Sequence, residues 1–348
     1  MQKLYNIRNF DLDELRELLS SSGEPKFRAV QIFTWLYKKG IKDFSCISDI
    51  PEKMRDLLAS NYTCDLPEIA DILISRDGTK KFIFRLNDGN YIESVLIPDE
   101  NRNTVCVSTQ VGCKYGCIFC ASGKIGFIRN LSPAEILGQI ICIQLESEKN
   151  ITNIVFMGMG EPFDNYDAVI RSIGIINARE GMNIGARKII VSTAGIVPAI
   201  RRFSLLKWQV RLAVSLHAAD DFTRNMLMPI NKKFCISELV DACRYYIEKT
   251  GRRLTFEYIL IKGINDSEKH LKDLAVIAKM LNADVNIIRF SKIGVSDLLC
   301  PDVGKVVAFV EGLRQKGVRA TARRSRGCDI MAACGQLAGV CQGKNEKV

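Results

Sequence analysis

The chain has 348 residues, 47% of them hydrophobic, so it can fold as one large domain or two smaller ones around a sizeable core. No run approaches the roughly 18–20 consecutive apolar residues that cross a bilayer, and residues 1–6 lack an apolar signal segment, so we expect a soluble, cytoplasmic protein with no membrane contact. The formal net charge of +10 favours a polyanionic partner, although a basic surface that only aids solubility gives the same value.

Cysteine is unusually frequent in this chain. There are thirteen cysteines, an odd number, in a chain far too long to depend on disulfide staples. We therefore expect reduced thiols, some of which bind metal. The two histidines, His217 and His270, are too few for a site built from several imidazoles. Several cysteines carry no further signal and are interpreted as plain buried or surface thiols: Cys46, Cys64, Cys142, Cys235, Cys243, Cys300, Cys328 and Cys341.

Three helices are predicted in residues 11–62. Asp11 is a suitable N-cap for the first helix, in which leucines recur at helical spacing. The second helix ends at Gly40, and Pro51 can begin the third. These patterns predict a helical N-terminal accessory domain over residues 1–65.

Short apolar runs replace the helical pattern in residues 67–97. They are separated by Asp77-Gly78 and Asp88-Gly89, which are typical of hairpin turns. We predict a three-stranded β meander that forms a linking segment over residues 66–98.

Strand and helix patterns alternate from about residue 104 onward. This alternation predicts a fold of the α/β class, a partial (β/α)6 barrel similar to a TIM barrel, over residues 99–329. A late helix is expected at residues 304–316, a short strand at residues 319–323 and a C-terminal segment at residues 330–348. In such folds the chemistry takes place at the C-terminal ends of the strands. The predicted barrel strands are Val105–Ser108, Ile154–Met157, Lys188–Ser192, Leu212–Leu216, Phe256–Ile261 and Val285–Phe290.

A cysteine loop with the spacing Cys113-x3-Cys117-x2-Cys120 follows the first predicted barrel strand. Gly112 and Gly116 allow this loop to turn tightly around a bulky group. Three thiolates can hold three irons of a 4Fe–4S cluster and leave the fourth iron free to bind a small molecule. A structural zinc site is the alternative, but zinc prefers four ligands, and no second cysteine pair lies at a fitting distance.

Small and polar residues follow the next three predicted strands. Gly160 and Glu161 lie in the run Gly158–Pro162, where glycines let the backbone approach a ligand and a carboxylate can bind an ammonium group. Ser192 ends the third strand, and Ser215, Leu216 and His217 end the fourth. Each residue alone is compatible with simple capping of a strand end. Their recurrence at equivalent barrel positions favours a shared ligand site.

The spacing of the cysteine loop and its position after the first barrel strand resemble the radical S-adenosylmethionine superfamily. Further motifs are the runs Cys106–Cys113, Gly158–Pro162, Ser215–His217, Arg323–Gly327 and Ala333–Leu337. The most specific features among them are Cys106 and Cys334, which lie outside the cysteine loop. Together these motifs resemble the RlmN family of RNA methyltransferases, and the resemblance spans nearly the whole chain, including the helical N-terminal part.

The resemblance implies methylation of carbon 2 of an adenosine in the peptidyl-transferase centre of 23S rRNA, and of the adenosine at position 37 in transfer RNAs. It implies that Cys334 accepts a methyl group from a first S-adenosylmethionine. A second one, reduced at the cluster, then supplies a radical that activates this methyl group. Cys106 would resolve the protein–RNA adduct and form a transient disulfide with Cys334, and Glu93 would accept a proton.

The resemblance also implies the cofactor ligands. Cys113, Cys117 and Cys120 would bind the cluster. The expected contacts to S-adenosylmethionine are Gly160, Glu161, Ser192, Ser215, Leu216, His217 and Ser291.

Two residues near the sixth predicted strand depart from the family pattern. Ser291 stands where the family usually has an asparagine that contacts S-adenosylmethionine, and Arg289 stands where it usually has proline. The related Cfr enzymes, which methylate carbon 8, usually have arginine there. Glu161-Pro162 and the run Arg323–Gly327 resemble RlmN instead. Methylation of carbon 8 is therefore one alternative, and a non-catalytic iron–sulfur protein that binds RNA is another.

The expected partners are 23S rRNA, transfer RNA and an electron donor such as flavodoxin or ferredoxin, and the chain is expected to be a monomer. Phosphate contacts require basic side chains, which we expect on the barrel mouth and the N-terminal domain. The candidate clusters are Lys80-Lys81, Arg201-Arg202, Lys232-Lys233, Arg252-Arg253 and Arg323-Arg324 with Arg326.

Overall fold

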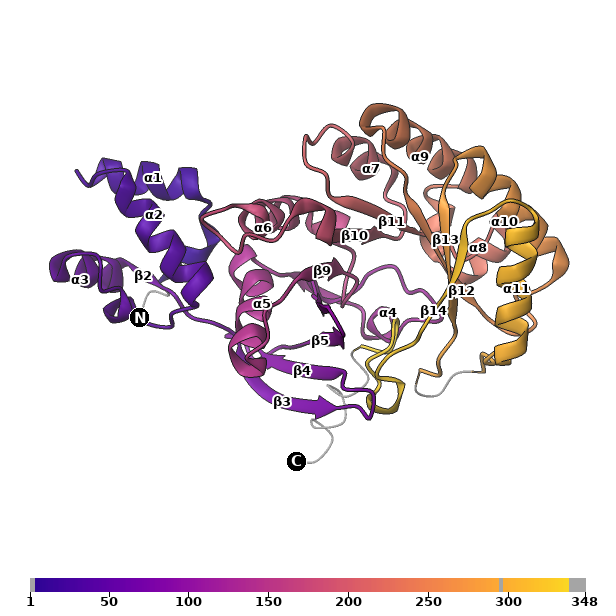
Figure 1. Cartoon of the computed structure of the whole chain (residues 1–348), viewed down its shortest axis with the longest axis horizontal. Helices are drawn as coiled ribbons and strands as arrows, with labels where there is room; N and C mark the ends of the chain where they lie inside the picture. The colour runs from indigo at the N-terminus through magenta and orange to yellow at the C-terminus, as the bar shows by residue number, and fades with distance from the viewer. Residues whose placement is uncertain (1–3, 294–296, 338–348) are drawn as a thin grey trace.

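The computed structural model describes residues 4–293 and 297–337. A group of N-terminal helices lies beside a larger α/β body (Figure 1). A short parallel pair of strands, β1 and β2, joins the two ends of the helical group and was not predicted. The elements of this group are β1 (Tyr5–Asn6), α1 (Leu12–Ser21), α2 (Phe27–Thr34), α3 (Glu52–Asn61) and β2 (Tyr62–Thr63).

The ends of these helices confirm the predicted signals. The Asp11 carboxylate accepts hydrogen bonds from the backbone N–H groups of Asp13 and Glu14, at 3.0 and 2.9 Å. Glu14 accepts one from the Asp11 N–H in return, which completes a capping box. Helix α2 continues into one π-helical turn, which ends at Gly40 with a φ of 64°, a conformation that favours glycine.

Ten strands form one sheet in the order β14-β13-β12-β11-β10-β9-β6-β5-β4-β3. The strands from β6 to β14 pair in parallel, whereas β3, β4 and β5 are antiparallel to their neighbours. The strands are β3 (Glu68–Ile74), β4 (Lys80–Arg85), β5 (Tyr91–Asp99), β6 (Arg102–Cys106), β9 (Asn153–Phe156), β10 (Ile189–Thr193), β11 (Arg211–Ser215), β12 (Thr255–Leu260), β13 (Asp284–Arg289) and β14 (Ala320–Arg323).

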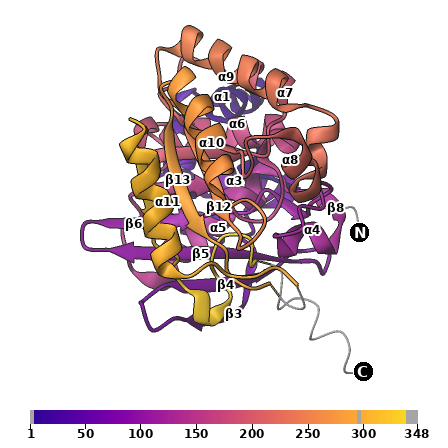
Figure 2. The same ribbon diagram turned by 90° about the vertical axis from the view of Figure 1, so that its right-hand side faces the viewer.

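Helices connect the parallel strands and cover the outer face of the curved sheet (Figures 1 and 2). The strands are rich in buried Val, Ile and Phe because both faces of a parallel barrel sheet are covered. The predicted partial barrel with its helical N-terminal part and β meander is confirmed. The helices are α4 (Ala121–Ile125), α5 (Pro133–Ser147), α6 (Tyr166–Asn177), α7 (Val197–Phe203), α8 (Asp221–Leu227), α9 (Ile236–Thr250), α10 (Glu268–Met280) and α11 (Val303–Gln315).

The meander does not form a sheet of its own. Its last strand, β5, pairs antiparallel with the first barrel strand, β6, so the meander extends the barrel sheet at one edge. A second hairpin, β7 (Gln110–Gly112) with β8 (Phe127–Asn130), encloses the cysteine loop and was not predicted. Its strands are too short to show an alternating pattern.

Polar groups join the N-terminal part to the barrel helices, beside an apolar core that the two parts share. The Asn9 side chain accepts a hydrogen bond from the Ala134 N–H at the beginning of α5, at 3.0 Å. Arg171 of α6 donates to the Asn9 carbonyl at 2.9 Å and pairs with Glu14. In the part of the chain that the structure describes, no helix has the length and apolar character needed to span a bilayer.

Candidate active site

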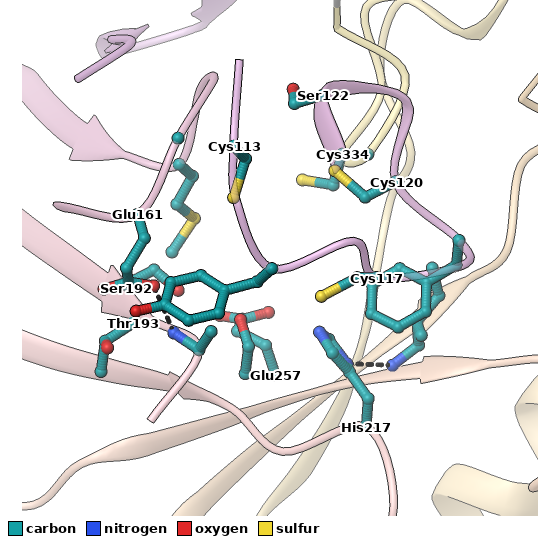
Figure 3. Close-up of a pocket in the computed structure, with 18 of the residues that line it drawn as sticks. Cys113, Cys117, Cys120, Ser122, Glu161, Ser192, Thr193, His217, Glu257 and Cys334 are labelled. Carbon is teal, nitrogen blue, oxygen red and sulfur yellow. Dashed lines mark hydrogen bonds between the residues drawn. The ribbon is translucent and has the colours of Figure 1, made fainter. Parts of the chain in front are cut away.

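A cavity lies at the C-terminal ends of the barrel strands, beside the cysteine loop (Figure 3). Most of the predicted site residues line it, namely Cys113, Cys117, Cys120, Gly160, Glu161, Ser192, Ser215, His217 and Cys334. Leu216 is instead fully buried in the barrel core. Ser291 lies outside the lining, with its hydroxyl 3.7 Å from the thiol of Cys328. Cys106 and Glu93 are buried and are also not part of this lining.

The cysteine loop is shaped by two glycines with left-handed backbones. Gly112 has a φ of 72°, and a β-carbon there would lie 1.7 Å from the carbonyl oxygen of Gly126. This contact is close because the Cys113 N–H donates to the same carbonyl at 3.0 Å. Gly116 has a φ of 59° in open space. The predicted tight turns are confirmed, and the three thiols point into one shared space (Figure 3).

Replacing Gly112 by alanine should prevent the loop from closing. The left-handed backbone alone disfavours a β-carbon by about 1–3 kcal/mol, and the clash with the Gly126 carbonyl adds to this. We expect a lower thermal unfolding temperature and less iron per chain. Gly251→Ala is the control, because Gly251 has a similar φ of 64° but nothing within 4 Å of the added β-carbon. Equal effects of both variants would contradict the proposed role of the clash.

The three thiols fit a cluster better than a single metal ion. Among the described residues, no three His, Cys, Asp or Glu side chains are close enough together to bind one ion. A four-iron cube offers a separate iron to each thiolate, so its ligands surround a space instead of meeting at a point. Burial raises the pKa of Cys113 to about 12 and the pKa of Cys117 well above its ordinary value. These thiols therefore become anions only when a metal cation binds them.

A buried arginine gives a second reason to expect an anionic group here. Arg224 is fully buried, and its hydrogen bonds in the described part of the chain go only to neutral oxygens. Burial lowers the pKa of Arg224 to about 10, and negative charge on a metal-bound Cys117, followed by that of Asp221, opposes this shift. A buried cation needs a countercharge. A cluster bound by thiolates would supply one within electrostatic range.

Glu161 is held by backbone N–H groups from two elements. Its carboxylate accepts hydrogen bonds from Phe163 at 3.0 Å and from Ala194, just after β10, at 2.6 Å. Burial raises the pKa of Glu161 to about 7. An ammonium ligand would favour the charged form, and each carboxylate oxygen can accept a further hydrogen bond. The site therefore suits the amino group of an amino acid.

The hydrogen bonds of His217 determine its tautomer. Its Nδ1 accepts a hydrogen bond from the Ile259 N–H at 2.9 Å. Burial, and then the charge of Arg224, lower the pKa of His217 to about 3, so the ring is neutral. A neutral ring whose Nδ1 is an acceptor carries its hydrogen on Nε2. Because His217 lines the cavity, this N–H is available to a ligand.

The lowered pKa of His217 should make the protein less stable in weak acid. The unfolded chain binds a proton at His217 below about pH 6.5, whereas the folded chain does not until about pH 3. Stability therefore falls as the pH drops between these values, by roughly 2 kcal/mol at pH 5. Urea unfolding at pH 7.5 and pH 5 should show this loss in the wild type and a smaller loss in His217→Gln. The same loss in both proteins would contradict this assignment.

Cys106 and Cys334 come from distant parts of the chain but lie near each other. Burial, followed by the charge of the neighbouring Cys334, raises the pKa of Cys106 to about 12. Both thiols are free in this structure. The segment after Cys334 packs against the loop helix α4, because the Ala121 N–H donates to the Gly335 carbonyl at 2.7 Å. Gly335 allows this close approach. Its φ is 82°, and a β-carbon at this position would lie 2.9 Å from the Phe119 carbonyl oxygen.

The burial of Lys81 contradicts one prediction about RNA contacts. We expected the Lys80-Lys81 pair on an RNA-binding surface, but Lys81 is fully buried. Its Nζ lies 3.5 Å from Oε1 of Glu93, which is also fully buried. A charged side chain in the sheet is stable only when it is paired. The alternation of β4 places Lys81 on the inner face, which the doublet of lysines did not reveal.

Two charged residues of the cavity wall were not identified as cavity residues from the sequence, although Arg323 was named as a candidate RNA contact. Glu257 of β12 is 4% exposed and accepts a hydrogen bond from the Asn286 side chain at 3.0 Å. Arg323 lies 3.7 Å from the other Glu257 oxygen and lines the cavity together with Cys334. The available signal was the carboxylate of Glu257, which interrupts an otherwise apolar predicted strand.

Comparisons with known proteins agree with this geometry. A family model described as the radical SAM superfamily matches residues 107–275, and one described as the ribosomal RNA large subunit methyltransferase N-terminal domain matches residues 5–63. A relative named probable dual-specificity RNA methyltransferase RlmN, from Clostridium perfringens (strain SM101 / Type A), is 46% identical over 95% of this chain and 96% of its own length. This chain belongs to the RlmN family.

Other members of the RlmN family and a solved structure extend the match. The RlmN relative from Bacillus velezensis is 44% identical over 95% of this chain and 92% of its own length. The crystal structure of a radical SAM methyltransferase from Sphaerobacter thermophilus has a TM-score of 0.91 and 44% identity, and the match covers 96% of this chain and 99% of that one. Membership of the radical SAM superfamily implies an iron–sulfur cluster and S-adenosylmethionine as cofactors.

Proposed function

We propose that this chain is a radical RNA methyltransferase that methylates carbon 2 of adenosine in 23S rRNA and at position 37 of transfer RNAs. The observation that carries this proposal is the position of Cys334. It lines the same cavity as the three cysteines of the loop and also neighbours Cys106. The names of the RlmN relatives support RNA as the substrate.

We assign Cys113, Cys117 and Cys120 as the ligands of a 4Fe–4S cluster, whose fourth iron binds S-adenosylmethionine. Two molecules of S-adenosylmethionine would be used in each turnover. Glu161 suits the amino group of this cofactor, and Ser192, Ser215 and the Nε2–H of His217 offer further hydrogen bonds. The proposed contacts of Leu216 and Ser291 have less support, because neither side chain lines the cavity in the described part of the chain.

The chain's own residues carry the methyl group. The Cys334 thiolate would accept it from a first S-adenosylmethionine by nucleophilic attack, which makes Cys334 a thioether and releases S-adenosylhomocysteine. When bound, the cluster and a second S-adenosylmethionine would supply the radical chemistry that activates this methyl group by removal of a hydrogen atom. The resulting methylene carbon on Cys334 bonds to carbon 2 of the adenine. Glu93 would accept the proton from carbon 2, and the unpaired electron of the adduct would return to the cluster. Cys106 would then attack the Cys334 sulfur, which forms the disulfide, breaks the bond from sulfur to the methylene carbon and, with one proton added, leaves a methyl group on carbon 2.

We also propose the division of labour along the chain. Residues 1–65 form an RNA-binding accessory domain, residues 66–98 the β meander, residues 99–329 the radical-generating barrel, and residues 330–348 the segment that carries Cys334. Residues 338–348, including Cys341, lie outside the described part of the chain. We further propose that the chain is a monomer in the cytoplasm. It would receive its electrons from a flavodoxin or ferredoxin.

Methylation of carbon 8 is the competing proposal, since Arg289 matches the related Cfr enzymes. In this structure Arg289 is exposed and donates a hydrogen bond to the Pro301 carbonyl at 2.8 Å. It is not among the described residues that line the cavity. This departure therefore leaves the cavity wall unchanged, which supports carbon 2.

Nucleoside analysis tests the proposal most directly. Ribosomal and transfer RNA would be isolated from a deletion strain complemented with this chain, digested and separated by liquid chromatography with mass detection. We expect 2-methyladenosine, whereas 8-methyladenosine would establish the alternative regiochemistry. Binding of RNA without formation of 5′-deoxyadenosine in a reduced assay would instead identify a non-catalytic iron–sulfur protein.

A further inference from the structure

The turn between β3 and β4 contacts the segment that leads to Cys334. Asp329 accepts hydrogen bonds from the Ser75 hydroxyl at 2.5 Å and from the Arg76 N–H at 3.1 Å. The Gly327 N–H donates to the Asp77 carboxylate at 3.0 Å. Both views show the C-terminal end of the described chain against this end of β3 and β4 (Figures 1 and 2).

Packing in the same place leaves little room for movement. A β-carbon at Gly327 would lie 2.8 Å from Cβ of Ala332 and 3.0 Å from the methyl group of Thr79. Gly327 therefore lets the segment lie directly on the turn. The Ala332 N–H donates to the Gly327 carbonyl at 2.9 Å, which closes the segment into a compact loop around the short helix η7 (Cys328–Ile330).

Lys81 links this contact to the buried interior. Its Nζ donates to the Met331 carbonyl at 3.4 Å and pairs with Glu93 at 3.5 Å. Met331 has a φ of 53°, which a residue with a β-carbon adopts only at a cost of about 1–3 kcal/mol. A fully buried ammonium group on its carbonyl helps to hold this backbone. Lys81 therefore joins Glu93 to the residue three positions before Cys334.

The opposite side of Cys334 is held independently. The Gly335 carbonyl accepts from the Ala121 N–H at 2.7 Å, and the Leu337 carbonyl accepts from the Ser122 hydroxyl at 3.1 Å. Both partners belong to α4, directly after the cysteine loop. The segment before Cys334 therefore contacts the β3–β4 turn, and the segment after Cys334 contacts α4.

We propose that the β3–β4 turn and Lys81 form a docking site that positions the Cys334 segment over the cavity. This site, Ser75–Thr79 with Lys81, is called the hairpin dock. It acts on the reaction only by placing the Cys334 thiol, so this inference rests on the proposed function. The meander is accordingly part of the catalytic architecture and more than a linker between two domains.

The test compares Asp329→Ala with a matched control in the full-length, cluster-loaded protein. Asp329 is exposed, so its removal breaks two contacts with the hairpin dock without opening the core. Asp241→Ala is the control, because Asp241 is an exposed aspartate that pairs with Arg244 on its own helix. Hydrogen–deuterium exchange of residues 327–337 and the fraction of methylated Cys334 would be measured for both variants.

We expect exchange in residues 327–337 of Asp329→Ala to be at least about tenfold faster than in the wild type, and Cys334 methylation to be several-fold slower. The control should match the wild type in both. Unchanged exchange would overturn the hairpin dock, and faster exchange with unchanged methylation would overturn its positioning role. A wild type that never carries a methyl group on Cys334 would refute the proposed function instead, and the exchange data would still decide whether the dock exists.

Lys81 variants provide an independent check. Lys81→Met removes both contacts but also a buried charge, so far-UV circular dichroism and thermal unfolding would first establish that it folds. In a folded variant we expect faster exchange around Met331, and Lys81→Arg should restore part of the protection. If folded Lys81→Met exchanged hydrogen around Met331 at the wild-type rate, the proposed role of Lys81 in the hairpin dock would be wrong.

Discussion

Cys334→Ala should abolish methylation of RNA while leaving the cluster intact. The alanine has no thiol to accept the methyl group, and no other described cysteine beyond the cluster loop lines the cavity. Losing a group that forms a covalent intermediate lowers turnover by roughly 10⁴-fold or more. Liquid chromatography with mass detection of methylated nucleosides would measure this loss.

Cys328→Ala is the matched control for Cys334→Ala. Cys328 lies in the same segment but is exposed and outside the cavity lining, so its removal should leave turnover close to that of the wild type. Iron content should stay normal in both variants, and formation of 5′-deoxyadenosine should stay normal in Cys328→Ala. Substantial RNA methylation by Cys334→Ala would refute the methyl-carrier role.

Cys106→Ala should fail at a later step. Cys334 can still accept a methyl group and bond to the base, but the thiol that resolves the adduct is missing. We expect a covalent protein–RNA species that survives denaturing gel electrophoresis and is absent in the double variant Cys106→Ala/Cys334→Ala. A free, methylated RNA product from Cys106→Ala would contradict the resolving role.

Cys117→Ala should eliminate the radical chemistry because the protein can no longer hold the cluster. With one of three thiolates missing, the cluster loses a ligand, and the buried Arg224 loses one of its proposed countercharges. We expect iron to fall from about four per chain toward zero, together with the brown colour. Anaerobic reconstitution followed by iron analysis and visible absorbance would measure this.

Cys235→Ala provides the control for the cluster variant. Cys235 is partly exposed and outside the cavity lining, so its removal should leave iron content and 5′-deoxyadenosine formation unchanged. If Cys117→Ala retained a full cluster and cleaved S-adenosylmethionine at the wild-type rate, the assignment of Cys117 as a ligand would be wrong.

Much of the fold was predictable because its signals are local. The capping box at Asp11, the left-handed Gly40 and the alternating strands and helices each depend on residues a few positions apart. The β7–β8 hairpin was missed because its strands are too short for a pattern to emerge. No local pattern predicts that β5 of the meander pairs with β6 of the barrel. This pairing depends on which barrel strand has an edge without a partner.

The sequence by itself predicted the chemistry. The spacing of the cysteine loop specifies three thiols around one group, and the family motifs single out Cys106 and Cys334. Only the tertiary structure decided how these groups are held. It placed Lys81 in the interior instead of on an RNA-binding surface, Arg224 beside the loop, and the Cys334 segment on the β3–β4 turn. The physical reason is that these contacts join residues far apart in the chain, and burial and charge pairing arise only when the sheet brings them together.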